Sequence, residues 1–135
     1  MKFTNLYADE IMFQNWLPYL QDLVGREHAT AIEIGSYEGY SSVWMMQNLL
    51  THPTALLICV DPFEANPEFN LGKVGDYYNT FLDNTKEWRD SGNLEVVKEF
   101  SSKAGALIKG RNIDFIYVDG SHEFKDVVLD IELTH

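Results

Sequence analysis

Acidic side chains lie at or just inside the ends of three short apolar segments of this 135-residue sequence. Glu33 lies within T-A-I-E-I, Asp61 follows L-L-I-C-V, and Asp119 follows I-D-F-I-Y-V. Segments this rich in β-branched and apolar residues are typical of buried parallel strands. Because the carboxyl ends of parallel strands meet at one edge of a sheet, the three carboxylates should gather there. They predict a pocket for a cationic ligand that carries a ribose, since a carboxylate attracts positive charge and accepts hydroxyl hydrogens.

The turn after the first segment contains two glycines. Gly35 ends the apolar run and Gly39 precedes a helical pattern, so the chain passes from a strand through a tight turn into a helix. Glycine lets the backbone approach a ligand closely, and amides at a helix start point outward. The spacing is not the G-x-G-x-x-G pattern that receives a dinucleotide pyrophosphate, which disfavours a nicotinamide-linked enzyme. A plain strand-to-helix turn is the alternative interpretation of the two glycines alone.

The composition indicates one globular domain and limits its partners. Hydrophobic residues make up 45% of the chain, which is enough for a core. The net charge of -11 repels phosphates, so neither nucleic acid nor an anionic membrane surface is expected as a partner. No apolar run approaches the roughly 18 residues of a membrane span, and the first residues lack a signal-peptide layout, so a cytoplasmic location is expected. The single Cys59 excludes an internal disulfide and is interpreted as a small buried hydrophobe.

Strands and helices that alternate along the chain would position these groups. Strands are expected at 30–34, 55–60, 94–100 and 113–118. Helices are expected at 38–50, 76–89, 101–109 and 124–133. Residues 1–29 form an N-terminal helical cover, in which Pro18 should interrupt the helix, and residues 30–135 form the ligand-binding domain. The loop between 64 and 75 has the length of a lid or a substrate wall.

The segment from 31 to 133 resembles the class I S-adenosylmethionine-dependent methyltransferases, within them the small-molecule O-methyltransferase-like branch. The motifs that carry this resemblance are E-I-G-S-Y-E-G-Y-S, V-D-P-F and I-D-F-I-Y-V-D-G-S-H-E-F. The resemblance implies an α/β fold with a Rossmann-like parallel sheet, strand order 3-2-1-4 and helices on both faces. It also implies S-adenosylmethionine as the cofactor, and this sulfonium nucleoside fits a pocket for a cationic, ribose-bearing ligand.

The first motif has several cofactor-binding residues by this resemblance. Glu33 is expected near the methionine amino group, while Gly35 and Gly39 lie against the cofactor. Two further residues of the same motif are assigned to the cofactor site, namely Ser36 and Tyr37.

The later motifs supply the nucleoside and catalytic residues by the same resemblance. Asp61 would take the ribose hydroxyls and Phe63 the adenine face. The loop that borders adenine would contain Ser101 or Ser102, between which the local spacing does not decide. The residues expected to face the reacting methyl group, as positioning groups or a base, are Asp119 and His122, and Asp119 is also assigned to the cofactor site.

The family's sheet has more strands than the four expected here, so the ligand-binding domain is expected to be incomplete. In metal-dependent relatives the residue matching Asp119 is one metal ligand, and the other ligands come from a part absent here. A divalent metal is therefore compatible with the motif, but the site is incomplete and no metal ligands are assigned. The fourth strand would have an open apolar edge, which predicts either a fragment or a homo-oligomer through that edge. The function expected is methyl transfer to an oxygen of a small molecule, and the alternative is a truncated, non-catalytic cofactor-binding or interaction module.

Overall fold

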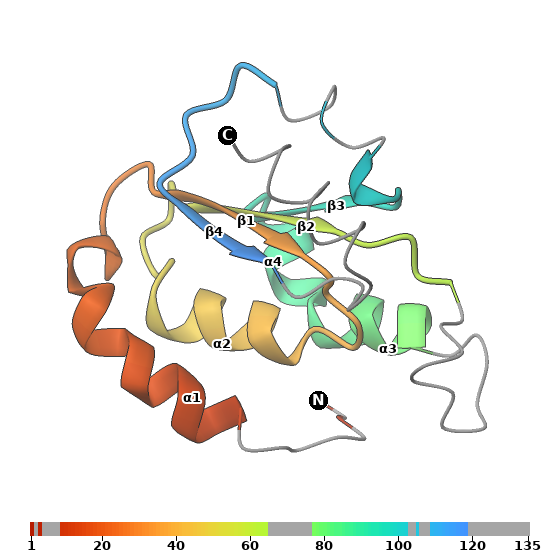
Figure 1. Ribbon diagram of the computed structural model, residues 1–135, viewed down its shortest axis with the longest axis horizontal. Coiled ribbons are helices and arrows are strands. Elements are labelled where there is room, and N and C mark those ends of the chain that lie inside the picture. Colours follow the sequence, from red (N-terminus) through yellow and green to blue (C-terminus); the bar gives the residue numbers. More distant parts are fainter. Residues whose placement is uncertain (2, 4–8, 65–76, 103–104, 106–108, 119–135) are drawn as a thin grey trace.

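The protein, described by a computed structural model at residues 1, 3, 9–64, 77–102, 105 and 109–118, is built on one parallel sheet. Its strands lie in the order β3-β2-β1-β4 (Figure 1). They are β1 (Thr30–Ile34), β2 (Leu56–Val60), β3 (Leu94–Val97) and β4 (Phe115–Val118). The fold class and the strand order expected from the sequence are confirmed.

The two central strands are apolar on both faces because both faces are covered. Side chains that alternate along β1 and β2 form two separate clusters, one of which packs against helices. The first cluster contains Ala31 and Leu57, and the second contains Ile32 and Ile58. The register Ile32↔Ile58 keeps side chains of the same kind beside one another.

Strand β3 ends three residues earlier than expected. The Val97 carbonyl accepts hydrogen bonds from the amides of Asp61 at 3.2 Å and Glu99 at 2.9 Å. The second bond joins residues two apart and turns the chain, so pairing with β2 cannot continue.

The N-terminal segment breaks near Pro18, as expected. Helix α1 (Asp9–Trp16) is followed by two short 3-10 helices, η1 (Leu17–Tyr19) and η2 (Gln21–Leu23). Proline has no amide hydrogen to continue the α-helical bonding. The Phe13 ring stacks on Trp44 at 4.9 Å between ring centroids. Helix α1 is thereby fixed against α2 (Tyr40–Asn48).

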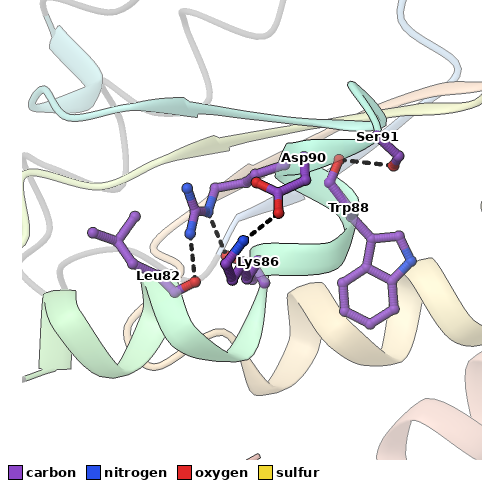
Figure 2. Close-up of polar contacts among 7 residues, drawn as sticks. Leu82, Lys86, Trp88, Asp90 and Ser91 are labelled. Carbon is purple, nitrogen blue, oxygen red and sulfur yellow. Dashed lines mark hydrogen bonds and ion pairs between the residues drawn. The ribbon is translucent and has the colours of Figure 1, made fainter.

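The segment expected as one helix at 76–89 forms two, α3 (Tyr77–Asn84) and α4 (Lys86–Asp90). Thr85 lies between them, and its hydroxyl donates to the Phe81 carbonyl at 2.7 Å. Arg89 reaches back and donates to the Leu82 carbonyl at 2.6 Å (Figure 2). The Phe81 carbonyl also accepts the Thr85 backbone amide at 3.0 Å, so the two side-chain groups add hydrogen bonds to carbonyls near the end of α3.

Helices lie on both sides of the sheet. Figure 1 shows α1 to α4 on one side and a further short helical segment, which begins at Ser101, on the other. Within the described residues, no helix is long and apolar enough to cross a membrane.

Gly39, the residue before α2, allows a close approach of α3. Its φ is +87°, and a Cβ at this position would lie 2.9 Å from Cδ2 of Phe81. Gly92 has a similar φ of +82° but open space around it. A comparison of alanine substitutions at the two glycines therefore separates the cost of backbone strain from the cost of steric crowding.

We expect Gly39→Ala to lower the free energy of unfolding by about 1–3 kcal/mol more than Gly92→Ala does, since both variants strain the backbone and only the first overpacks. Urea denaturation of both variants measures the difference. Equal losses in the two variants would contradict the packing described here.

Candidate functional site

The carboxyl ends of β1 and β2 meet at the glycine turn. Gly35 has a φ of 91°, and its amide donates to the Val60 carbonyl at 2.9 Å. Glu33 is in register with Cys59, and Asp61 follows Cys59 by two residues, so both carboxylates lie on the same face of the sheet. The structure therefore brings the first two acids predicted from the sequence to one edge.

Asp61 binds the backbone of two turns at once. Its Oδ2 accepts the amides of Ser36 at 2.9 Å and Tyr37 at 3.0 Å, and its Oδ1 accepts the amide of Phe63 at 2.6 Å. Burial raises the pKa of Asp61, and the three amides oppose that shift. A carboxylate offers about four acceptor positions. Three positions are taken by the amides, so one position, on Oδ1, has no donor among the described residues.

Two of the residues that donate to Asp61 have unusual backbone conformations. Tyr37 has a φ of 50° and Phe63 a φ of 52°. A left-handed conformation costs a non-glycine residue roughly 1–2 kcal/mol. Because Asp61 accepts the amides of both residues, its hydrogen bonds offset this cost and hold the two turns together. Strain of this kind is typical of a functional site.

Glu33 is fully buried beneath the first turn of α2. Its carboxylate accepts hydrogen bonds from the hydroxyls of Ser41 and Ser42, and the Cys59 sulfur lies 3.5 Å from its Oε2. Burial raises the pKa of Glu33, and the two hydroxyls oppose the shift. Neither serine is among the site residues expected from the sequence. Their position just after Gly39, where a helix begins, was the available signal.

The Ser36 hydroxyl is buried and makes no hydrogen bond of good geometry among the described residues, although it lies near Glu33 and lowers the pKa of that carboxyl. Buried hydroxyls are nearly always paired, because an unpaired one loses its bonds to water. The glycine turn is thus a place where a ligand or a water molecule would complete the hydrogen bonding.

Aromatic rings from α3 pack against both strained turns. Phe63 is 7% exposed and contacts Tyr78 and Phe81 at centroid distances of 4.6 Å and 4.9 Å. Tyr77 lies 5.0 Å from Tyr37 and 6.0 Å from Phe63. Burial, followed by the nearby charge of Asp61, raises the pKa of Tyr77. Phe63 therefore packs against α3 with little of its ring exposed, and the half-buried rings at the turns are those of Tyr37 and Tyr77.

The two serines predicted to border adenine are not bonded to this cluster by any hydrogen bond within the described residues. Ser101 is half-buried and Ser102 exposed, and neither hydroxyl bonds Glu33 or Asp61 in the described part of the chain. Across the described ranges, no three His, Cys, Asp or Glu side chains are grouped to hold a metal ion. The predicted catalytic pair lies outside the described residues and consists of Asp119 and His122.

Comparison with known protein families matches residues 32–135 to a family described as a methyltransferase domain. A similar curated protein is an uncharacterised protein of Acanthamoeba polyphaga mimivirus, 29% identical over 123 residues. The match covers 87% of this chain and 50% of that protein.

Three solved structures are similar in fold. Cofactor-bound Rv0187 from MTB has a TM-score of 0.61 at 15% identity, over 98% of this chain and 54% of its own. TrmK from M. capricolum, in complex with its cofactor product S-adenosylhomocysteine, has a TM-score of 0.55 at 15% identity, over 88% and 46%. The O-methyltransferase from Bacillus cereus, also with S-adenosylhomocysteine, has a TM-score of 0.55 at 17% identity, over 98% and 63%. The chain therefore spans about half the length of the first proteins it matches.

The raised pKa of Glu33 makes stability depend on pH. A carboxyl with a raised folded-state pKa contributes stability that is present below its ordinary value of 4.5 and is lost as the pH rises through the folded value. Glutamine does not titrate. We expect the free energy of unfolding of the native protein, minus that of Glu33→Gln, to fall as the pH rises above about 4.5, as measured by urea denaturation across pH.

Asp90→Asn is the matched control, because the Lys86 hydrogen bond lowers the pKa of Asp90 (Figure 2). Its contribution is present above its ordinary value of 3.8 and is lost as the pH falls. As the pH rises, the native-minus-variant difference in the free energy of unfolding should therefore fall for Glu33→Gln and rise for Asp90→Asn. A Glu33→Gln difference that stays flat above pH 4.5 would contradict the desolvation described for Glu33.

Proposed function

The chain belongs to the methyltransferase-domain family, and from that premise we propose that it transfers a methyl group from S-adenosylmethionine to an oxygen of a small molecule. The observation that carries this proposal is the hydrogen bonding of the Asp61 carboxylate. Its carboxylate lies at the end of β2, binds the glycine turn, and keeps one acceptor position for a ligand hydroxyl. A ribose hydroxyl beside a glycine turn suits such a position.

The residues present fit a sulfonium nucleoside in three respects. Asp61 offers an acceptor to the ribose, the left-handed Gly35 leaves room for close approach, and the buried Ser36 hydroxyl makes no hydrogen bond of good geometry within the described ranges. Two buried carboxylates on one face suit a ligand with positive charge. Other residues proposed to contact the cofactor, from their motifs, are Tyr37, Gly39, Phe63, Ser101 and Ser102.

When bound, the cofactor would supply a methyl group that its sulfonium sulfur makes electrophilic, and it would leave as the neutral thioether with the electron pair of the broken carbon–sulfur bond. The protein must align the acceptor and remove its proton. Asp119 and His122, in the fourth-strand motif, are proposed for these tasks, with imidazole as the base because an ordinary histidine titrates near neutral pH. The net charge of -11 favours a small acceptor over nucleic acid.

A non-catalytic module that associates through the sheet edge is the second candidate. Within the described residues β4 pairs with β1 alone, yet its side chains pack on both faces of the sheet. Phe115 and Tyr117 contact the helix-covered cluster, while Ile116 and Val118 contact the other. This pattern is typical of an interior strand, so a homo-oligomer that covers this edge is proposed under either function.

S-adenosylhomocysteine at 100 times its dissociation constant should stabilise the protein by about 2.7 kcal/mol, whereas NAD should not. Asp61→Asn should weaken the binding about tenfold or more, because it replaces a charged acceptor, and Asp90→Asn should leave binding unchanged. Calorimetric titration and thermal unfolding measure both effects. If the nucleoside neither binds nor shifts the unfolding temperature, the cofactor assignment is wrong, and an oligomeric mass would then favour the interaction module.

His122→Ala should lower the rate of methyl transfer to small hydroxylated acceptors by about 10²–10⁴-fold, the usual contribution of a general base. Its affinity for S-adenosylhomocysteine should stay within about twofold of the native value, since the residue is proposed to face the acceptor. Transfer of a labelled methyl group measures the rate. Unchanged turnover would remove His122 from the mechanism, and nucleoside binding without any turnover in the native protein would favour the non-catalytic module.

A further inference from the structure

The Glu33 carboxylate is enclosed by the protein's own donors. Its Oε1 accepts from Ser41, and its Oε2 accepts from Ser42 and lies 3.5 Å from the Cys59 sulfur. Glu33, Ser42 and Cys59 are all 0% exposed. These groups come from β1, β2 and the first turn of α2, so the carboxylate joins three elements at the turn.

Ser41 differs from the other groups around Glu33 because it is only partly buried. Its single hydroxyl proton is donated to Glu33, which fixes the direction of the side chain. Part of Ser41 is therefore accessible to a ligand, whereas the Glu33 carboxylate behind it is not.

We infer that Glu33 is a positioning residue: it holds Ser41 and the start of α2 in place for the bound nucleoside and does not itself contact the nucleoside's amino group. This inference rests on the proposed function. It also revises the expectation from the sequence, in which Glu33 met the amino group directly. The carboxylate has no exposed surface with which to do so.

A double-mutant cycle tests the action through Ser41. Glu33→Gln and Ser41→Ala should each weaken binding of S-adenosylhomocysteine about three- to tenfold, and the double variant should bind no more weakly than the weaker single variant, since residues that act as one unit are not additive. Calorimetric titration measures all four proteins. Additive losses would overturn the inference.

A ligand without the amino group tests for direct contact. The probe is the S-adenosylhomocysteine analogue in which hydrogen replaces the amino group. Glu33→Gln should weaken this analogue by the same factor as the parent ligand, within about threefold, because the positioning of Ser41 serves both. A loss that appears with the parent ligand and vanishes with the analogue would show a direct contact with the amino group and overturn the inference.

Ser42→Ala keeps the test decisive if Glu33→Gln does not fold. The Ser42 hydroxyl is fully buried and cannot reach a ligand, yet it helps to hold Glu33. Its loss should weaken both ligands about threefold, whereas unchanged affinity would overturn the inference. If the native protein binds neither ligand, the proposed function has failed, and that result is distinct from any pattern among the variants.

Discussion

The candidate site depends on one carboxylate that accepts three backbone amides. Asp61 joins the turn after β1 to the turn after β2, and the residues it bonds include two in left-handed conformations. Without these bonds nothing described here would offset the left-handed conformations of Tyr37 and Phe63. The rings of α3 would then lose the surface on which they pack. The position of the glycine turn therefore follows from the chemistry of Asp61.

The two carboxylates at this edge have different surroundings and so suit different tasks. Glu33 accepts side-chain hydroxyls and is closed off beneath α2. Asp61 accepts backbone amides and retains an acceptor position. An acid closed off by its own serines can organise the turn, whereas an acid with an open position can bind a ligand. Sequence spacing places both acids at one edge but does not distinguish these tasks.

Much of the fold could be predicted because its signals are local. The run Thr30–Ile34 and the acids after the strands predicted the parallel sheet and the shared edge of Glu33 and Asp61. Two features could not be predicted, since each needs a partner distant in sequence: the Asp61 bonds to Ser36 and Tyr37, and the burial of Phe63 under α3. The break at Thr85 could not be predicted either, because the Arg89 side chain folds back onto the Leu82 carbonyl without leaving a sequence signal. Side-chain bonds across such separations leave no periodic pattern.

The most direct measurement of the central claim is a crystal structure of the protein grown with S-adenosylhomocysteine. The account predicts a ribose hydroxyl within about 3 Å of Asp61 Oδ1, with the nucleoside seated against the turn that begins at Gly35. A nucleoside bound elsewhere, with Asp61 contacting only backbone amides, would contradict the account.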